Sequence, residues 1–544
     1  MGAAAQSVAD AHRAALGLSP SDYVFPDREP FGPGFPRFSP PSGRARLLSL
    51  VRRRLRIPGV QVSRIAGFVA FVPKGCVLSA DVEGIMSTRV PGAAVDLLYG
   101  NSIHYVGNES RDFSLQLRPG WSPERLRSHC YVGHVLLASR ELVQRCGGKR
   151  VLRGLTSHGR ALLLSEHAAG IERLDGLLYA TVGVDAEPAS DLGAVIDHCR
   201  RTGIDAECSN QRSPGVVDVI RRPAGTPRVA VIIPTRGTTT TVFGRERVMV
   251  VEAVRSLVTK SAYPNMEFIV VADTETPAGV RESLESIPHA DVTVVGYDRP
   301  FNFAEKINLG AVHTDAEYLL FMNDDVEVLS GNVIEVLLAH LADESVGQVG
   351  PLLLFEDGSI QSAGHLLNPV PFDLYRGYPP GLGGGQGILL AAREVSSVIA
   401  AFSMTRAADF RAVGGLSGIF PGDYNDVDFA LKLAALGKRT VITPVVRCCH
   451  FESKTRSARP DPVAVARLGS RWQHVVENDP YGNPFLQPYE FVWKADLDTR
   501  SVLNDAFGVP VAWDDEEWSR LRALPERSLH RTMYHPRWIK WVTP

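Results

Sequence analysis

From Arg228 to about residue 350 the chain alternates short apolar runs with helical periods, and this pattern constrains its fold most strongly. The run Val229–Ile233 is typical of a buried strand, and the apolar residues between Val248 and Val258 then recur at helical spacing. Further apolar runs are Phe268–Val271, Val292–Val295, Tyr318–Met322 and Val346–Gly350. Strands that alternate with helices predict an α/β fold with a doubly wound, mainly parallel sheet.

Polar residues follow three of the predicted strands. They are Pro234, Thr235 and Arg236 after the first strand, Asp273 after the second, and Asn323, Asp324 and Asp325 after the run that ends at Met322. Doubly wound sheets bind ligands at the carboxyl ends of their strands. A carboxylate pair at such an end suits a divalent cation and a bound diphosphate, although it is equally compatible with a solvated turn.

Several protein classes are disfavoured by what the sequence lacks. Neither GxxxxGK[ST] nor GxGxxG follows a predicted strand, which argues against P-loop and dinucleotide-binding enzymes. Lys and Arg total 58 against 60 Asp and Glu, so we expect no nucleic-acid partner. Seven scattered cysteines form neither a disulfide ladder nor a CxxC zinc pattern. Without a signal peptide or a run of about 18 apolar residues, we expect a cytoplasmic protein whose membrane contact, if any, is peripheral.

Two polar clusters follow further along the chain. Asp426 and Asp428 precede a helical pattern of alanines and leucines, a position where an acidic residue is also an ordinary helix cap. His450 follows the apolar stretch Val441–Val446, and a lone histidine is more often a structural hydrogen-bonding group than a metal ligand. Taken alone, these clusters leave their function open.

Seven motifs together resemble the family 2 glycosyltransferases, an inverting, nucleotide-sugar-dependent class with the GT-A fold. The motifs are IIPTRG (Ile232–Gly237), IVVAD (Ile269–Asp273), FNFAEKIN (Phe301–Asn308), FMNDDVEV (Phe321–Val328), VGGL (Val413–Leu416), YNDVDFALKL (Tyr424–Leu433) and HFESKTR (His450–Arg456). The resemblance covers roughly residues 228–490, and the order of the motifs makes it far more specific than any one of them.

The resemblance implies a donor site for a nucleotide-diphospho-sugar. Its residues would be Pro234, Thr235, Arg236, Asp273, Lys306, Asn308 and Asp324. Thr235 and Asp273 would hold the nucleoside, while Lys306 and Asn308 would lie near the diphosphate. The family's Asp-x-Asp region falls on residues 323–325, where Asn323 replaces the first Asp and Asp324 would contact the ribose or the metal.

The resemblance also implies a metal site and a catalytic base. Asp325 and His450 would bind Mn²⁺ or Mg²⁺, and the imidazole favours Mn²⁺ because Mg²⁺ prefers oxygen ligands. Asp426 would take the proton of the acceptor hydroxyl, and Asp428 would orient the acceptor or the base. Inversion at an anomeric carbon needs both a base and stabilisation of the departing diphosphate, which these two sites would supply.

The first half of the chain carries weaker traces of the same pattern. Phe68–Gly75 parallels Tyr318–Asp325, with Lys74 and Gly75 in place of the acidic pair. Thr156–Leu162 falls where Asn425–Leu431 falls in the second half, and both acids are replaced, by Ser157 and Gly159. We expect a degenerate partial GT-A-like α/β module that positions an acceptor glycan or packs on the active domain.

These observations divide the chain into four regions. They are an extended lead-in with a basic segment (1–60), the degenerate module (61–220), a catalytic GT-A domain (221–490) and a Trp-rich tail (491–544). The arginines and leucines of residues 44–56 and the aromatic, cationic tail suit a membrane interface, although packing on their own domain is the more common outcome.

The sequence therefore favours a metal-dependent inverting glycosyltransferase of the hexosyltransferase type. It would move a sugar from a nucleotide-sugar donor to a glycan or lipid-linked glycan acceptor in cell-envelope or capsule polysaccharide synthesis, in the cytoplasm or at the inner face of the membrane. One alternative is a nucleotidyltransferase, which would carry a glycine-rich basic loop after the first strand. A second is a non-catalytic glycan-binding or scaffold protein, although such a protein has no chemical reason to keep Asp426, Asp428 and His450.

Overall fold

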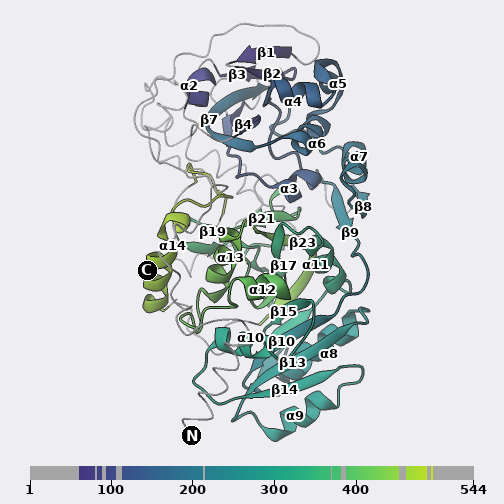
Figure 1. Ribbon diagram of the computed structural model, residues 1–544, viewed down its shortest axis with the longest axis vertical. Helices are drawn as coiled ribbons and strands as arrows, with labels where there is room; N and C mark the ends of the chain where they lie inside the picture. Colours follow the sequence, from purple (N-terminus) through teal and green to yellow (C-terminus); the bar gives the residue numbers. More distant parts are fainter. Residues whose placement is uncertain are drawn as a thin grey trace.

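The computed structural model describes residues 61–493 apart from 66, 80–81, 88–93, 106–112, 212–214, 369, 381–386, 452–460 and 487–491. The expected lead-in (1–60) and nearly all of the Trp-rich tail lie outside the described residues. Two sheets form two modules, the first at the top of Figure 1 and the second below it. None of the helices in the described ranges is long and apolar enough to cross a membrane.

The first module contains a seven-stranded sheet in the order β1-β2-β6-β4-β7-β3, with β5 paired to β4. Its strands are β1 (Gln61–Ile65), β2 (Phe68–Val72), β3 (Cys76–Leu78), β4 (Leu97–Tyr105), β5 (Phe113–Gln116), β6 (Leu136–Ser139) and β7 (Ile171–Val182). Its helices are α2 (Val82–Ser87), α3 (Pro123–Ser128), α4 (Arg140–Arg145), α5 (Gly148–Gly154) and α6 (Ser157–His167). Helix α7 (Leu192–Thr202) and the hairpin of β8 (Ala206–Ser209) and β9 (Asp218–Arg221) lead into the second module.

The second module contains a ten-stranded sheet in the order β14-β13-β10-β15-β22-β17-β23-β16, with β18 paired to β17 and β21 to β23. Its strands are β10 (Val229–Thr235), β13 (Met266–Asp273), β14 (Val292–Tyr297), β15 (Tyr318–Met322), β16 (Val326–Val328), β17 (Val346–Leu354), β18 (Ile360–Ser362), β21 (Arg393–Val395), β22 (Phe402–Arg406) and β23 (Arg439–His450). Two hairpins lie outside this sheet, β11 (Thr239–Val242) with β12 (Arg245–Val248), and β19 (His365–Leu367) with β20 (Pro371–Asp373). The helices are α8 (Met249–Lys260), α9 (Ala278–Glu285), α10 (Phe303–Ala311), α11 (Val333–Leu341), α12 (Ala407–Ala412), α13 (Asn425–Ala435) and α14 (Pro462–Val476).

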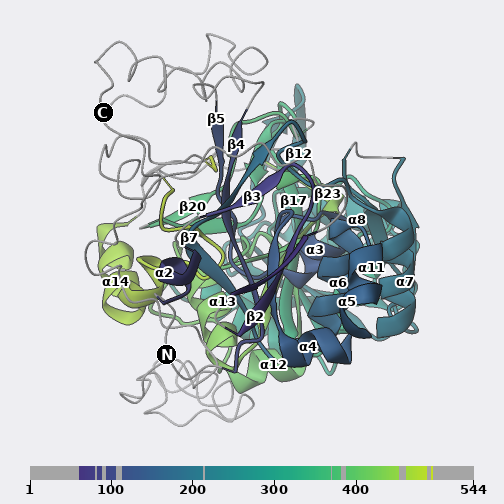
Figure 2. The same cartoon turned by 90° about the horizontal axis from the view of Figure 1, so that it is seen from above.

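Strand β10 shows why the sequence forms a sheet covered on both faces. All seven of its residues are buried. Val229, Val231 and Ile233 pack in the same core cluster as the buried residues of α8 and α11, whereas Ala230 and Ile232 pack with those of α10. A strand buried on both faces needs a continuous apolar run, which explains the composition of this segment. Figure 2 shows α8 and α11 on one side of the sheet and α13 and α14 on the other.

The prediction of a doubly wound α/β fold is confirmed. Strands β14, β13, β10 and β15 are parallel neighbours at one end of the sheet. The other half is mixed, because β22 runs antiparallel to both β15 and β17, while β17 and β23 are parallel. The carboxyl ends of β10, β13, β15, β17 and β23 therefore meet at one edge of the sheet, which we call the carboxyl edge.

The first sheet repeats the mixed half of the second sheet. Strands β2-β6-β4-β7-β3 have the same order and directions as β15-β22-β17-β23-β16, and β5 pairs with β4 as β18 pairs with β17. Helix α6 precedes β7 as α13 precedes β23. The first sheet has no counterpart of the parallel strands β10, β13 and β14 among its described residues, since β2 pairs on its outer side with the antiparallel β1.

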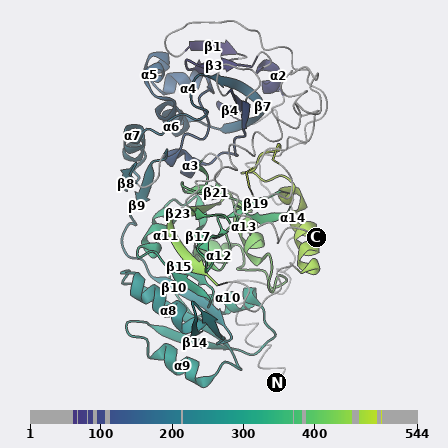
Figure 3. The ribbon, with the colours of Figure 1, turned by 180° about the vertical axis from the view of Figure 1, so that it is seen from behind.

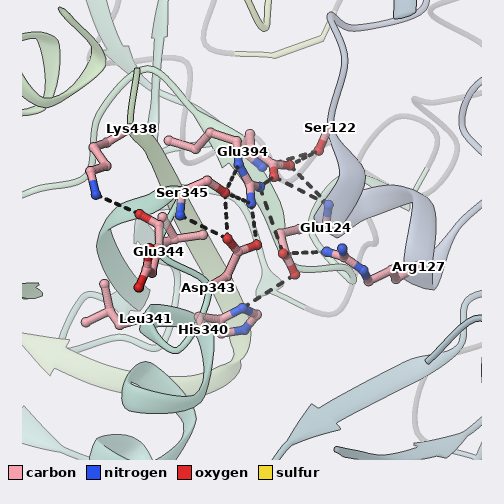
Figure 4. Close-up of polar contacts among 12 residues, drawn as sticks. Ser122, Glu124, Arg127, His340, Leu341, Asp343, Glu344, Ser345, Glu394 and Lys438 are labelled. Carbon is pink, nitrogen blue, oxygen red and sulfur yellow. Dashed lines mark hydrogen bonds and ion pairs between the residues drawn. The ribbon is translucent and has the colours of Figure 1, made fainter. Parts of the chain in front are cut away.

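The two modules meet through a buried polar interface centred on α3 (Figure 4). Ser122 Oγ donates to Glu394 Oε2 at 2.5 Å. Glu124 Oε1 accepts from Arg127 at 2.5 Å, and Glu124 Oε2 lies 3.5 Å from His340 Nδ1 at the end of α11. Helix α3 lies between the two modules in the front and back views (Figures 1 and 3), and the contacts of Ser122 with Glu394 and of Glu124 with His340 join it to the second module.

A second contact brings the chain after α14 back to the first module. Asn483 Nδ2 donates to Asn101 Oδ1 at 2.8 Å and to the carbonyl oxygen of Arg118 at 2.7 Å. Gly120 lies so close to this segment that a Cβ there would be 1.7 Å from the carbonyl oxygen of Pro480. Only glycine fits at position 120, which fixes how closely the modules approach.

Candidate active site

The end of β10 supplies a compact polar cluster at the carboxyl edge. Thr235 Oγ1 donates to Asp324 Oδ2 at 2.6 Å and accepts from the backbone N–H of Gly237 at 2.9 Å. Gly237 has a φ of +70°, and a Cβ there would lie 2.7 Å from Thr276, so the turn requires glycine. Burial, aided by the neighbouring Asp325, raises the pKa of Asp324 to about 6. A ligand that brings positive charge here would stabilise the ionised form.

Lys306 ties the ends of β10 and β13 together. Its Nζ lies 2.5 Å from Asp273 Oδ1 and donates to the carbonyl oxygen of Thr235 at 2.8 Å. The side chain is fully buried, and burial lowers the pKa of Lys306 although Asp273 opposes this. Arg236, by contrast, is exposed, and its guanidinium stacks over the ring of Phe301 at 4.7 Å.

Asn308 does not present a free group to a diphosphate. Its Nδ2 donates to the carbonyl oxygen of Leu416 at 2.8 Å, and its Oδ1 accepts from the Leu416 N–H at 2.9 Å. The residue is 1% exposed. Asn308 therefore holds the loop that leads to α13, and Pro234, buried within β10 opposite Val271, is likewise part of the framework. Residue type alone could not distinguish these roles from direct contact with a ligand.

Asp325 and His450 face each other at the carboxyl edge. Strand β16 pairs with β23 so that Val326 lies opposite His450, and this register brings His450 Nε2 to 3.1 Å from Asp325 Oδ1. Asn323 Nδ2 lies 3.2 Å from the same imidazole nitrogen, and Gln361 Nε2 lies 2.7 Å from His450 Nδ1. The sequence argument missed Gln361, because nothing in the short strand β18 marks it as a neighbour of His450.

This donor set fits a divalent cation. A carboxylate oxygen and an imidazole nitrogen 3.1 Å apart can share one ion, and Mn²⁺ accepts both donor types. Within the described ranges no third His, Cys, Asp or Glu joins the pair. The remaining coordination positions would be open to diphosphate oxygens and water, as in metal sites that bind nucleotide substrates.

Asp426 lies in the first turn of α13, as expected, and is half-buried. Two residues before it, Tyr424 at the helix N-cap has a φ of +62°, a conformation that a tyrosine rarely adopts and that sets the direction in which the helix starts. Burial raises the pKa of Asp426 above its usual range, and His365 acts against this. A base with a raised pKa binds the proton of a hydroxyl group more readily.

His365 and Asp373 form a second polar pair that faces Asp426, and the sequence argument missed both. His365 Nδ1 lies 2.6 Å from Ser397 Oγ, and its Nε2 lies 3.4 Å from Asp373 Oδ1. Burial lowers the pKa of His365, but Asp373 and Asp426 outweigh it, so the net shift is upward. The hairpin β19–β20 brings the pair together, and a single histidine among apolar residues gives no periodic signal.

Asp428 is fully buried and does not face solvent. Its Oδ1 accepts from Arg471 Nη1 and from Trp472 Nε1, both at 2.9 Å, and Lys432 Nζ lies 3.8 Å from its Oδ2. Arg471 and Trp472 belong to α14, so Asp428 fastens α13 to α14. This placement does not favour a role in orienting the acceptor. It favours a role in positioning α13, the helix that carries Asp426.

We expect Asp428→Ala to lower the free energy of unfolding by about 3 kcal/mol or more, because it leaves buried cationic partners without their carboxylate. Asp426→Ala, two residues earlier on the same helix, should change stability by no more than about 1 kcal/mol. Urea unfolding of both variants checks this. Equal stabilities would show that the Asp428 cluster does not hold α13 in place.

The fold and the carboxyl edge together define a GT-A type α/β protein. Residues 231–412 match the family model for glycosyl transferase family 2, and this part of the chain belongs to that family. The resemblance seen in the sequence is confirmed by this match.

Two curated proteins are similar to most of the chain. The O-antigen biosynthesis protein RfbC of Myxococcus xanthus is 30% identical over 400 residues, which cover 70% of this chain and 30% of that protein. The uncharacterized protein y4gI of Sinorhizobium fredii is 27% identical over 412 residues, covering 68% of this chain and 43% of that protein. The chain thus spans less than half the length of these relatives.

Solved structures show more distant similarity. GalNAc-T7 with UDP, GalNAc and Mn²⁺ aligns at a TM-score of 0.34 and 13% identity, covering 45% of this chain and 48% of that one. The mannosyltransferase PcManGT from Pyrobaculum calidifontis with GDP-Man and Mn²⁺ aligns at 0.31 and 15%, covering 57% and 83%. Similarity at this level bears on neither the substrate nor the cofactor of this chain.

Proposed function

We propose that this protein is a metal-dependent inverting glycosyltransferase of the hexosyltransferase type. It transfers a sugar from a nucleotide-diphospho-sugar to a hydroxyl group of a glycan or glycolipid acceptor. The similarity to an O-antigen biosynthesis protein supports a role in cell-envelope polysaccharide synthesis, in the cytoplasm or peripherally at the inner face of the membrane.

One observation carries the proposal: the metal-binding pair and the base both lie beside the same short segment of the chain, residues 361–365. Gln361 contacts His450, and His365, only four residues further on, faces Asp426. Four extended residues span at most about 14 Å. Asp325 with His450 and Asp426 therefore lie within reach of one donor and one acceptor.

The residues at the carboxyl edge would have different roles in binding the donor and in catalysis. Thr235 and Asp273 border the position of the nucleoside. Lys306 holds both of them, and its ammonium group offsets the negative charge of Asp273. Asp325 and His450 would hold a Mn²⁺ or Mg²⁺ ion, which when bound supplies Lewis-acid stabilisation of the departing diphosphate. Asp426 takes the proton from the acceptor hydroxyl. These steps require no covalent intermediate on the protein.

The pH profile should report on Asp426. The base must be ionised, and burial raises its pKa, so kcat/KM should fall on the acid side at a pH above the ordinary Asp value of about 3.9. The imidazolium of His365 favours the ionised form of Asp426, so His365→Gln should move this acid limb to higher pH. An acid limb that stays in place in His365→Gln would contradict the assignment and point to Asp324 instead.

We also propose that residues 61–220 are a degenerate GT-A-like module and residues 221–490 the catalytic domain. The repeated strand order of the two sheets supports this division. Ser157 and Gly159 stand in the first turn of α6, where α13 carries Asp426 and Asp428. Without these acids the first module cannot deprotonate an acceptor, and with Lys74 and Gly75 in place of Asp324 and Asp325 it lacks the carboxylate that would hold the metal.

Ser157→Ala should therefore leave the release of nucleoside diphosphate within about twofold of the wild-type rate. The serine occupies the position of the base but has no carboxylate to lose. A loss of turnover comparable to that of Asp426→Asn would contradict the proposal that the first module is inactive.

A further inference from the structure

The first module contains a cavity that lies away from the carboxyl edge of the catalytic sheet. It has a volume of about 400 Å³ and is bordered by α3, the second half of α6, the start of β7 and α7. These helices lie side by side where the first module meets the second (Figures 1 and 3). Small-molecule sites typically measure about 300–1,000 Å³, so the cavity is large enough for one or two sugar rings.

One wall of the cavity is a rigid aromatic surface. Trp121 borders the cavity and is only half-buried. Tyr99 and Tyr131, both fully buried, support its ring, with centroids 6.4 and 6.5 Å from that of the indole. An aromatic ring held in one orientation presents a flat apolar face at little entropic cost. The C–H face of a pyranose ring is a suitable partner for such a surface.

A chain of fixed polar groups forms another part of the lining. Arg127 Nε donates to His198 Nε2 at 3.4 Å, and His198 Nδ1 lies 2.7 Å from Glu166 Oε1. Because Nε2 accepts, Nδ1 carries the proton, which fixes both the tautomer and the orientation of the imidazole. Arg201 donates to both oxygens of Glu166 at 2.6 and 2.7 Å. These bonds hold the carboxylate and the guanidinium still, so they can receive hydroxyl groups without reorganising.

Hydrogen-bonding capacity remains on this part of the lining. A carboxylate has about four lone-pair sites, and three bonds from His198 and Arg201 occupy part of them. The hydroxyl groups of Ser165 and Thr202 donate to backbone carbonyl oxygens, and their own oxygens can still accept a hydrogen bond. A planar carboxylate and a guanidinium beside an aromatic face form the combination that binds the vicinal hydroxyls and the ring of a sugar.

The charges of this cavity are already paired within the protein. Arg127 pairs with Glu124, which is shared with Arg221, and Glu166 pairs with Arg201. The two charged residues that border the cavity, Arg127 and Glu166, have opposite signs. The hydrogen bonds from Arg201 and His198 outweigh burial and keep the pKa of Glu166 below its usual range, so the carboxylate stays ionised. Because the cavity offers no surplus positive charge, it does not suit a phosphate or a nucleotide.

We propose that this cavity binds a neutral saccharide unit, with Trp121 as the stacking surface and Glu166 and Arg127 as hydroxyl ligands. This site is separate from the donor site. The proposal of a saccharide site does not depend on the proposed transferase activity. Arg127 connects it to Glu124 and, through that residue, to His340 of the catalytic module. A glycan held here is bound directly beside the junction of the two modules.

The test is saturation-transfer NMR on the full chain with a panel of neutral glycosides. The panel contains the methyl glycosides of glucose, galactose, mannose, rhamnose and N-acetylglucosamine, and inorganic phosphate is titrated separately as the anionic probe. We expect saturation transfer to at least one glycoside and no competition by phosphate. Trp121→Leu should weaken that binding at least about tenfold, because the aromatic face is lost.

Because Trp121 packs on two buried tyrosines, a second variant keeps the test independent of folding. Ala169 is exposed and borders the cavity, so Ala169→Trp should block binding while the melting temperature stays unchanged. Val151→Trp, at an exposed position of the same module that does not border the cavity, is the matched control and should bind like the wild type. Asp426→Asn should also retain glycoside binding.

Three results would overturn the proposal. The first is the absence of saturation transfer to every glycoside in the panel. The second is transfer that survives Ala169→Trp, and the third is displacement of the glycoside by phosphate. If glycosides bind but no nucleotide-sugar does, the proposed transferase activity fails while this inference stands.

Discussion

Asp426→Asn is expected to reduce the turnover of the protein about 10²- to 10⁴-fold, measured as release of nucleoside diphosphate from the donor. The amide has nearly the same shape as the carboxylate but cannot take the proton of the acceptor hydroxyl. Donor affinity should be unchanged within about threefold, because Asp426 acts on the acceptor side and not on the nucleotide. The loss should therefore appear in kcat.

A matched control lies three residues earlier, just before the start of α13. Asp423 accepts a hydrogen bond from the backbone N–H of Asp461 and is half-buried like Asp426. Asp423→Asn should retain turnover within about threefold. If both variants lost activity equally, the start of α13 as a whole would be disturbed, and the assignment of Asp426 as the base would be wrong.

Asp325→Ala is expected to weaken Mn²⁺ binding by at least about 10- to 100-fold. Removing a residue that only hydrogen-bonds to a metal ligand typically lowers metal affinity by about 10- to 100-fold. Asp325 is proposed as one of two direct protein ligands, so its loss should weaken binding at least as much. Titration followed by electron paramagnetic resonance, without any substrate, measures the effect directly. His450→Ala should act in the same direction, since the two side chains are 3.1 Å apart.

Glu327→Ala is the matched control for this prediction. Glu327 lies on β16, two residues after Asp325, but its side chain contacts Arg247 at 3.2 Å instead of His450. Its removal should leave Mn²⁺ affinity unchanged within about twofold. Unchanged affinity in Asp325→Ala, or equal losses in both variants, would contradict the proposed metal site.

The buried strands of the fold were predictable from the sequence, and the polar hairpins were not. The strand predicted at Tyr318–Met322 coincides with β15, because a strand covered on both faces needs a continuous apolar run. The hairpin of β11 and β12 went unpredicted, since its threonines, arginines and glutamate show no apolar period. The pairing of β11 with β12 depends on local backbone hydrogen bonds and on the packing of Val242 against Met249, Cys449 and Phe451.

The candidate site was predictable only in part. The family motifs pair Asp325 with His450, and the register of β16 with β23 brings the two residues together. The resemblance places Asn308 near the diphosphate and gives Asp428 the role of orienting the acceptor or the base. Both side chains are buried and make their hydrogen bonds with the protein, which for Asp428 favours the role toward the base. A polar residue type does not reveal whether its partner is a ligand or a buried arginine, and only the tertiary contacts decide this.

The most direct test of the central claim is calorimetric titration of the full chain with uridine, thymidine, guanosine and cytidine diphospho-sugars. Each titration is made with Mn²⁺ and with a chelator, for the wild type and for Asp325→Ala. The account predicts that one nucleoside class binds in the presence of Mn²⁺, and that chelation or Asp325→Ala abolishes this binding. Binding by none of the donors, or binding that survives both, would contradict the account and favour a non-catalytic glycan-binding protein.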